Sequence, residues 1–441
     1  MKSFISLLTA LFVMSLLATA SIADTTIKPK VFKYNVAKWT LSDQKTYDAW
    51  FQKVLDGNID APLYSVIKEF KDLIENDPKL FMLFTQMFDQ VPSEYTTDPL
   101  GMPQIKNYHQ MLQVMNRVLT MAPEFSQSGF VGFPINSILN WPMATPAGQQ
   151  AFLDKRVNGK IKQILNKWAV FLDSKESRYV LSADPRNGWF GEDAKKAMPD
   201  FEKDFICDPK APYYGFKSWD DFFTRKFRPE ARPVASPDDD YIIANACESA
   251  PYKLARNVQY TDTFWIKSEP YSLKHMLDDD PLTKMFVGGT IYQAFLSALS
   301  YHRWNSPVSG TVVKTKIIDG SYYAESSIVG YSEGGCDSQA YISQTATRGL
   351  IFIESDNKDI GLMAILFIGM GEVSSNEFTV FEGQHINKGD ELGMFHFGGS
   401  THCLIFQPGV AIEFDLRGQT PGIHSHNIKV REKIATVKKT N

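Results

Sequence analysis

The sequence predicts an α+β protein, with a helical N-terminal part followed by a β-rich, largely antiparallel C-terminal part. Three observations support this prediction. Before residue 180, apolar residues recur at three- and four-residue spacing, as on the buried face of a helix. After Asp221, short β-rich runs alternate with glycine-bearing turns, as in antiparallel sheets. With 441 residues, the chain is long enough to form two domains.

Two segments show the helical pattern most clearly, and a break rich in Pro and Gly over residues 129–146 separates them. Their apolar positions are Tyr108, Met111, Leu112, Met115, Val118 and Leu119 in the first, and Val157, Ile161, Ile164, Leu165, Trp168 and Leu172 in the second. Because such a face must be buried, these stripes predict core packing rather than a cofactor site.

The predicted β-rich part contains runs such as 310–318 and 361–368, which have high β propensity and are bounded by turn residues. A stretch rich in turn formers precedes this part. We therefore expect a signal peptide over 1–23, a helical domain over 24–180, a connecting segment over 181–218 and a second domain over 219–441.

The N-terminus has the pattern of an export signal. Lys2 precedes an apolar run over residues 4–17, and two small-x-small sites follow, ending at Ala20 and Ala23. The run is short for a membrane span, which needs about 20 apolar residues. We expect cleavage after Ala23 and an exported protein, periplasmic or secreted, with a retained anchor and peripheral membrane contact as the alternatives.

Composition excludes some functions. The formal net charge is −4, and no basic stripe suggests binding to nucleic acid. The four cysteines are far apart and form no Cys-x-x-Cys, and His424 and His426 lack further ligands at suitable spacing. We therefore expect no nucleic-acid partner and no metal site.

The most informative stretch is Gly398-Gly-Ser-Thr401, which precedes an apolar run. Glycine tolerates strained backbone geometry, so a serine hydroxyl can reach the carbonyl of the glycine before it. Attack of Ser400 Oγ on the Gly399 carbonyl would convert the amide into an ester. Elimination and hydrolysis would then leave a pyruvoyl group at position 400. A β-turn between two strands is the plain alternative for these four residues.

The wider sequence resembles the phosphatidylserine decarboxylase family, in order and spacing, from about Trp219 to Pro408. The resemblance is carried by the Gly-Gly-Ser-Thr site, Trp219-Asp-Asp-Phe-Phe-Thr-Arg-Lys-Phe-Arg-Pro-Glu-Ala-Arg-Pro-Val234, Tyr301-His-Arg-Trp-Asn-Ser-Pro-Val-Ser-Gly310, Thr347-Arg348 and Gly369-Met-Gly-Glu-Val-Ser-Ser375. The N-terminal part, with Asp98-Pro-Leu-Gly-Met-Pro103 and Tyr108-His-Gln-Met-Leu112, resembles the extra helical domain of a subgroup that includes tryptophan decarboxylases.

This resemblance implies a zymogen that cuts itself between Gly399 and Ser400 into a large and a small chain. The pyruvoyl cofactor would be covalent, made from Ser400, and would act as the electron sink for decarboxylation. His302 matches the histidine of the family motif and would protonate the product carbon. The implied reaction is the conversion of phosphatidylserine to phosphatidylethanolamine in phospholipid biosynthesis.

The chain departs from the family at two positions of the self-cleavage triad. Asn305 stands where the second histidine is expected, and Asn cannot act as a base. Glu248, in Asn245-Ala-Cys-Glu-Ser249, is nearest to the expected aspartate. Glu248 or His402 could serve as the base instead, or Glu248 could be a paired surface acid.

Two alternatives to the phospholipid reaction remain open. The helical domain and the absence of a later membrane span favour a soluble decarboxylase of a free amino acid, aromatic and tryptophan-like. The altered triad favours an exported, non-catalytic binding protein with the same fold. The predicted partners are therefore an amino-acid or aminophospholipid substrate, with the two chains from one precursor.

Overall fold

The computed structural model describes residues 51–57, 61–91, 105–125, 134–262, 271–296, 299–324, 339–372, 375–397, 400–422 and 424–439, without the side chains of residues 140 and 141. All of these residues belong to one compact unit, 36–441. The expected signal peptide, and Gly399 of the predicted cleavage site, lie outside the described residues.

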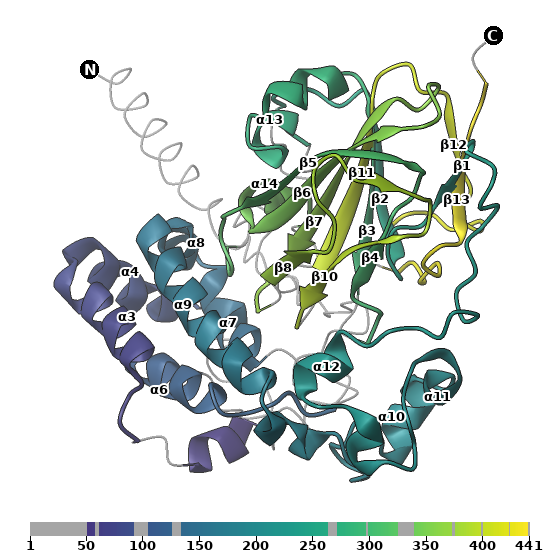
Figure 1. Cartoon of the computed structure of the whole chain (residues 1–441). Helices are drawn as coiled ribbons and strands as arrows, with labels where there is room; N and C mark the ends of the chain where they lie inside the picture. The colour runs from purple at the N-terminus through teal and green to yellow at the C-terminus, as the bar shows by residue number, and fades with distance from the viewer. Residues whose placement is uncertain are drawn as a thin grey trace, which may run out of the picture. The chain divides into compact units, whose positions relative to one another are not determined.

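Helices dominate the described chain before residue 180 (Figure 1). They are α3 (Ser65–Asn76), α4 (Pro78–Asp89), α6 (Tyr108–Val118), α7 (Pro134–Met143), α8 (Pro146–Leu153), α9 (Lys155–Leu172) and the 3-10 helix η2 (Lys175–Val180). Side-chain oxygens accept hydrogen bonds from the first free N–H groups of several helices, which fixes where these helices begin. The capping residues are Asp77 for α4, Asn107 for α6, Thr145 for α8 and Asp154 for α9.

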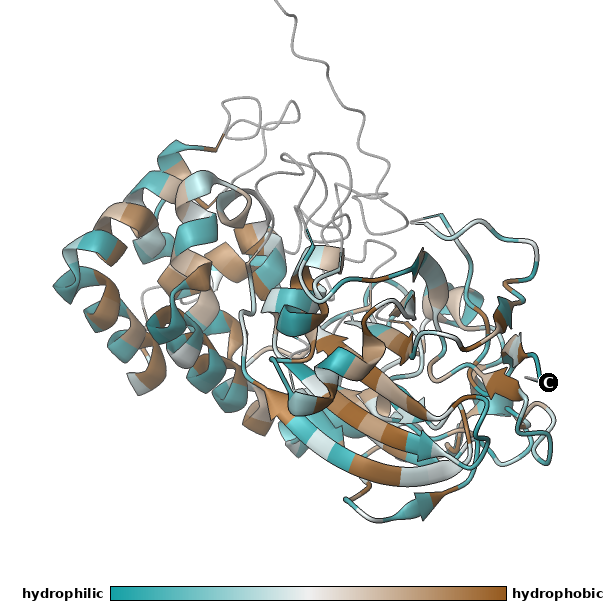
Figure 2. Ribbon diagram, turned by 90° about the horizontal axis from the view of Figure 1, so that it is seen from above, coloured by the Kyte–Doolittle hydropathy of each residue, from teal (hydrophilic) through white to brown (hydrophobic). Residues whose placement is uncertain are grey.

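The predicted apolar stripes are the buried faces of these helices. In α9 the residues from Val157 to Leu172 at three- and four-residue spacing are buried, and in α6 the buried face includes Met111, Leu112 and Met115. Figure 2 shows the helices with brown apolar stripes alternating with teal polar ones. The interpretation of these stripes as core is confirmed.

Short helices connect the helical part to the sheets. They are α10 (Glu192–Ala197), α11 (Phe201–Asp204), η3 (Pro212–Gly215) and α12 (Trp219–Phe223). Aromatic residues of this stretch, including Trp189, Phe190 and Phe201, belong to the same hydrophobic cluster as the helices. The connecting stretch is therefore folded onto the helical part. The domain boundaries themselves stay a prediction.

The C-terminal part is built on a seven-stranded sheet with strand order β2-β3-β11-β7-β6-β5-β9, in which all neighbours are antiparallel. Two three-stranded sheets, β4-β10-β8 and β1-β13-β12, accompany it. The strands are β1 (Ile242–Ala244), β2 (Ala250–Arg256), β3 (Thr290–Leu296), β4 (Arg303–Asn305), β5 (Gly310–Ile318), β6 (Arg348–Ser355), β7 (Leu362–Gly369), β8 (Ser375–Phe378), β9 (His385–Ile386), β10 (Glu391–His396), β11 (Ser400–Phe406), β12 (Ile412–Phe414) and β13 (Lys433–Val437). The predicted α+β class is confirmed.

The large sheet separates two hydrophobic clusters. Along β11, Leu404 and Phe406 belong to one cluster, whereas Cys403 and Ile405 belong to the other. Successive side chains of a strand point to opposite faces, so both faces of the sheet are covered. The first cluster also contains Trp304 and Phe395 of the β4-β10-β8 sheet. Three short helices, α13 (Leu273–Met276), η4 (Pro281–Phe286) and α14 (Gln339–Thr345), contribute to the second cluster.

Candidate active site

Ser400 is the first residue of β11, a central strand of the large sheet. It lies between Leu296 of β3 and Gly369 of β7, its partners in the two neighbouring strands. Ser400 is fully buried, and its hydroxyl has no hydrogen-bond partner among the described residues. Buried hydroxyls normally have a partner, so the hydroxyl of Ser400 is unusual among the described residues.

His402 lies two residues further along β11, on the same face as Ser400 because strand side chains alternate. The rings of Tyr292 and Phe367 lie next to its imidazole. Burial lowers the pKa of His402 to about 3, and the Ala294 carbonyl opposes this shift only in part. His402 is therefore neutral at pH 7 and a weak base.

His302 immediately precedes β4 and is also fully buried. Its ring stacks on Phe223 of α12, with ring centroids 4.0 Å apart. Its carbonyl accepts a hydrogen bond from the N–H of Phe395 in β10 (2.9 Å). Phe223 also contacts Phe397, the last described residue before the cleavage segment. The structure thus places His302 beside the strand that leads to Ser400.

Asn305, at the end of β4, has a specific structural contact. Its Nδ2 donates a hydrogen bond to the Gly389 carbonyl (2.9 Å), and its backbone N–H donates one to the Ala246 carbonyl (2.8 Å). The side chain is buried. Asn305 therefore holds the turn that precedes β10. A role in self-cleavage for this residue stays a prediction.

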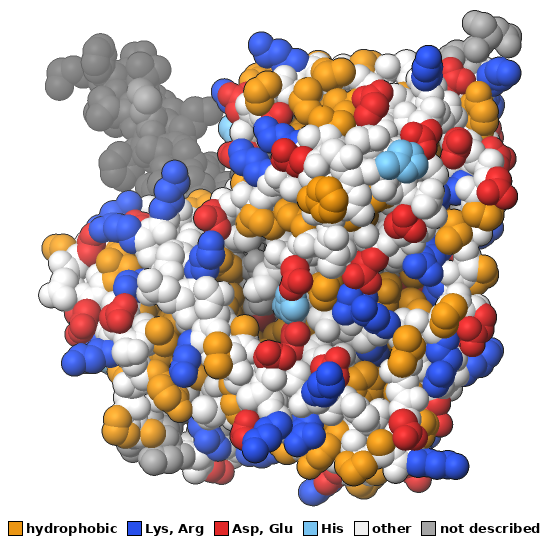
Figure 3. All heavy atoms as spheres, in the orientation of Figure 1, with side chains coloured by type: hydrophobic (Ala, Val, Ile, Leu, Met, Phe, Trp, Pro, Cys, Tyr) orange, Lys and Arg blue, Asp and Glu red, His pale blue; other side chains and the backbone are white. Residues whose placement is uncertain are grey.

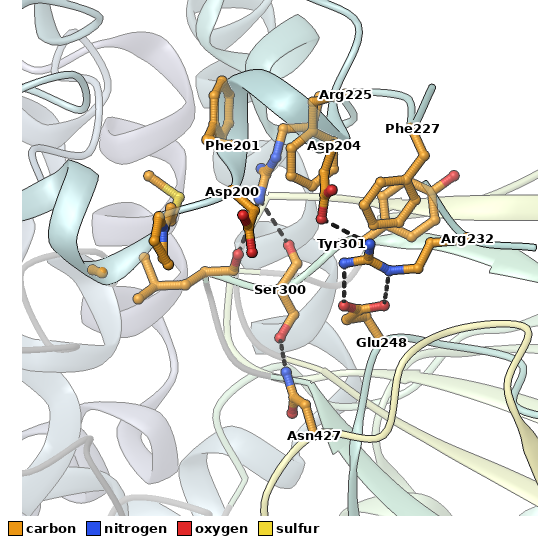
Figure 4. Close-up of a pocket in the computed structure, with 15 residues that line it drawn as sticks. Asp200, Phe201, Asp204, Arg225, Phe227, Arg232, Glu248, Ser300, Tyr301 and Asn427 are labelled. Carbon is orange, nitrogen blue, oxygen red and sulfur yellow. Dashed lines mark hydrogen bonds and ion pairs between the residues drawn. The ribbon is translucent and has the colours of Figure 1, made fainter. Parts of the chain in front are cut away.

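Glu248 forms a bidentate ion pair with Arg232, in which Nη2 and Nε donate to the two carboxylate oxygens (2.8 and 3.1 Å). Arg232 also donates to Asp204 (2.7 Å), and the Val430 N–H donates to Glu248 (2.8 Å). Figure 4 shows Arg232 between the two acids. Both oxygens of Glu248 are thus engaged in hydrogen bonds, and its role as a base stays a prediction.

A pocket of about 360 Å³ lies beside this ion pair. Tyr301 and Ser300, which directly precede His302, form part of its wall (Figure 4). Arg225 donates to the carbonyls of Leu299 (2.9 Å) and Ser300 (3.3 Å), and burial lowers its pKa to about 10. The pocket therefore brings Glu248 close to the histidine motif, whereas Ser400 does not line it.

Glu372 is a buried acid that the sequence did not single out, although it lies within Gly369-Met-Gly-Glu-Val-Ser-Ser375. It follows Gly369, the β7 partner of Ser400, by three residues, a reach of at most about 11 Å. Gly371, with a positive φ of 59°, turns the chain there, and its N–H donates a hydrogen bond to the Tyr322 carbonyl (3.1 Å). The carboxyl of Glu372 therefore lies near the Ser400 end of the sheet.

Glu372 joins this end of the sheet to the helical part. Its Oε1 accepts hydrogen bonds from the N–H groups of Ile135 (2.7 Å) and Asn136 (2.8 Å), in the first turn of α7. Burial raises the pKa of Glu372 to about 7, although these backbone N–H groups oppose the shift. Its Oε2 has no hydrogen-bond partner among the described residues. Burial thus brings the pKa of Glu372 close to neutral pH.

The surface of the molecule carries mixed charge on the face seen in Figure 3. On that face, Lys and Arg side chains are interspersed with Asp and Glu, and apolar side chains are scattered.

Within the described residues, no helix has both the length and the apolar character needed to cross a membrane. The same part of the chain has no group of three or more His, Cys, Asp or Glu side chains that could hold a metal ion.

Two family models match this chain, and both describe phosphatidylserine decarboxylase. The first covers residues 64–198 and the second residues 219–436. Together the two models match more than half of the chain, in the helical and the β-rich parts respectively. Both matches place the chain among the decarboxylases, which are carboxy-lyases.

Relatives that are named as decarboxylases agree with this class. The chain is 40% identical to the L-tryptophan decarboxylase of Psilocybe cyanescens over 86% of this chain and 87% of that protein. It is 44% identical to the decarboxylase iboD of Amanita muscaria over 64% of this chain and 86% of that protein. Identity to the phosphatidylserine decarboxylase proenzyme 3 of Schizosaccharomyces pombe is 31%, over 45% of this chain and 20% of that protein. The chain belongs to the phosphatidylserine decarboxylase family.

Proposed function

We propose that the chain matures by self-cleavage at Ser400 and then acts as a pyruvoyl-dependent decarboxylase. The observation that carries the proposal is the hydroxyl of Ser400, which is fully buried and has no hydrogen-bond partner among the described residues. It follows directly after two glycines at the start of a central strand. Relatives named as proenzymes support the same processing.

In this proposal Ser400 Oγ attacks the Gly399 carbonyl carbon, the C–N bond of the peptide breaks, and an ester forms. Loss of the Ser400 α-proton and rupture of the Cβ–O bond release the Gly399 carboxylate and leave dehydroalanine. Addition of water and loss of ammonia then give the pyruvoyl group. This group supplies the electrophilic carbonyl that takes up the electron pair left by carbon dioxide.

The remaining steps fall to residues already described. His302 is proposed to protonate the substrate α-carbon after carbon dioxide leaves, because histidine is suited to proton transfer near neutral pH. Its stacking on Phe223 fixes the plane of the ring. The buried surroundings exclude water, which strengthens the electrostatic contacts that these residues make.

The matched family suggests two candidate substrates for this proposal, and both carry an α-amino carboxylate. Phosphatidylserine is the first candidate, because both matched models describe its decarboxylase. A specific observation favours a free aromatic amino acid as the second candidate. Two relatives that match over 85–86% of this chain, and therefore through both of its parts, are named L-tryptophan decarboxylases.

The maturation step is tested by the intact mass of the purified chain. We expect two products, the smaller one beginning at residue 400 with a pyruvoyl end and finishing at Asn441. Ser400→Ala should stay uncut and inactive, because Ala fits the space and lacks the nucleophile. Thr401→Val is the matched control. It removes the neighbouring hydroxyl, which donates to the Ala294 carbonyl (3.0 Å), and should cost stability without blocking cleavage.

A single uncut wild-type chain would contradict the proposal and favour an exported binding protein with this fold. The substrate is tested by carbon dioxide release from the mature enzyme, with phosphatidylserine vesicles and L-tryptophan compared under the same conditions. Release from the vesicles alone supports the phospholipid reaction, whereas release from the amino acid alone supports the second candidate. Release from neither contradicts both.

A further inference from the structure

Phe397 has an unusual backbone conformation at a position next to the proposed cleavage site. It is the last described residue before Gly398 and Gly399, and its φ is 33°. Residues other than glycine rarely adopt positive φ, and a bulky side chain makes this conformation costly in free energy. The surroundings of Phe397 must therefore stabilise it.

Within the described part of the chain, three aromatic rings contact the buried ring of Phe397 in edge-on geometry. The ring centroid of Trp168, in α9, lies 4.8 Å away with an interplanar angle of 87°. Phe223 and Trp219, both in α12, lie at 5.6 and 6.0 Å. Edge-to-face pairs at these distances are favourable, and Trp168 makes the closest of them. The indole is itself fixed, because its Nε1 donates to the Met121 carbonyl (2.8 Å).

The other end of the cleavage segment is also held. Ser400 pairs with Leu296 on one side and Gly369 on the other. Two residues separate Phe397 from Ser400, and both of these flanking residues are held by the contacts given above. Fixing the ends lowers the entropy that must be lost before a hydroxyl can attack a carbonyl.

We propose that Trp168 is a positioning residue for maturation, which holds Phe397 in its strained conformation and so favours self-cleavage at Ser400. The helical part of the chain thereby acts on the cleavage site of the β-rich part. This inference rests on the proposed self-cleavage at Ser400. It assigns to an N-terminal tryptophan a function in processing rather than in turnover.

Processing and turnover should respond differently to a change at Trp168. Before cleavage, Phe397 and Ser400 are joined through the bond that must break. After cleavage, Gly399 is a chain end, and the constraint from Phe397 no longer acts on residue 400. Substitution of Trp168 should therefore slow the appearance of the small chain and leave the turnover of each mature molecule unchanged.

The test compares Trp168→Phe with a matched control, Trp189→Phe. Trp189 is also buried, its Nε1 also donates to a carbonyl at 2.8 Å, that of Pro123, and its ring also packs on Trp219. Its described ring partners do not include Phe397. Freshly synthesised precursor is followed by intact mass for the half-time of cleavage, and the same samples are assayed for unfolding midpoint and for carbon dioxide released per small chain.

We expect Trp168→Phe to lengthen the half-time roughly tenfold relative to Trp189→Phe, at similar unfolding midpoints and equal turnover per small chain. Equal half-times in the two variants, with a wild-type chain that is cut, overturn this inference and leave the proposed function intact. An uncut wild-type chain overturns the proposed function, and the inference with it.

A second variant tests the backbone conformation itself. Phe397→Gly removes the ring and adopts positive φ without strain, so the segment would lose both its anchor and its stored strain. We expect cleavage of Phe397→Gly to be slower than that of the wild type. Cleavage at the wild-type rate would show that the conformation of Phe397 does not matter, and would overturn the inference even if Trp168→Phe were slow.

Discussion

Glu372 accepts a hydrogen bond from the backbone N–H of Ile135 (2.7 Å), so an acid near the Ser400 end of the sheet caps helix α7 from a distance of more than 200 residues in sequence. The helix N-terminus favours a negative charge, whereas burial disfavours it. Burial prevails and raises the pKa of Glu372 to about 7. The stability of the junction between the helical and β-rich parts should therefore depend on pH.

The first prediction concerns this junction. The pKa of Glu372 is raised in the folded chain, from an ordinary 4.5 to about 7. The stability that protonation contributes is complete below pH 4.5 and is lost as the pH rises through 7. Glu372→Gln keeps a neutral acceptor for the helix. We expect it to raise the free energy of unfolding at pH 8 by about 1–3 kcal/mol relative to the wild type, with little difference at pH 4.5.

Denaturant unfolding at both pH values measures this effect. Glu69→Gln is a suitable control, because Glu69 is an exposed acid that pairs with Lys160 (2.8 Å). If wild type and Glu372→Gln show the same pH dependence, Glu372 does not titrate in this range.

A second prediction concerns His396, which bridges Asp220 (3.0 Å) and Glu377 (2.8 Å). Burial opposes the charge of His396, but the hydrogen bonds and charges of the two acids outweigh it and raise the pKa to about 9. The stability from this bridge is complete below pH 6.5 and is lost as the pH rises through 9. His396→Gln should therefore flatten the fall in stability between these values.

The unfolding midpoint from pH 6.5 to 9.5 gives the measurement for His396. His385→Gln serves as the control, since His385 also contacts an acid, Asp356 (2.9 Å), but is exposed. A slope that is unchanged in His396→Gln would contradict the proposed bridge.

A third prediction separates the chemistry of His302 from its packing. His302→Phe keeps a ring against Phe223, whereas His302→Ala removes it. We expect both variants to lose turnover by roughly a hundredfold, the usual scale for a lost general acid. Only the Ala variant should also lose stability, because only it leaves a cavity. Both should still be cleaved.

Carbon dioxide release and intact mass together check this prediction. Full turnover in His302→Phe would refute the proposed proton transfer. Uncut chains in both variants would instead assign His302 to processing.

The fourth prediction concerns Asn305. Asn305→His places an imidazole where the family carries its processing histidine and should speed cleavage or leave it unchanged. The substitution also disturbs the hydrogen bond to the Gly389 carbonyl, which should cost about 1 kcal/mol of stability. Asn305→Ala, which loses the same hydrogen bond and adds no base, controls for that cost. The appearance of the small chain from fresh precursor gives the rate, and a strong slowing in Asn305→His alone would count against this alignment.

Much of the fold could be predicted from local pattern. The stripe from Val157 to Leu172 specified a buried helix face, because a period near 3.6 residues places these side chains on one side. The run over 361–368 predicted a strand, and β7 (Leu362–Gly369) is buried along its whole length. Ser400 could be predicted as the nucleophile because the Gly-Gly-Ser-Thr motif is continuous in sequence.

The partners of the candidate residues could not be predicted, because they come from distant segments. The residues next to Glu248 in sequence do not reveal its partners. Its carboxylate pairs with Arg232 and accepts a hydrogen bond from the N–H of Val430. Asn305 departs from the family pattern, which the sequence shows, but its hydrogen bond to the Gly389 carbonyl depends on how β4 and β10 pair.

The sequence by itself determined the class of fold and the family and predicted the nucleophile, since each of these depends on the order and spacing of residues along the chain. Only the tertiary structure decided that Glu372 caps α7 and that Trp168 packs against Phe397. Both contacts join the helical part to the β-rich part, where burial shifts a pKa and stabilises a strained backbone. Such effects depend on the solvent and the neighbours that folding removes or brings together, and local sequence carries no record of them.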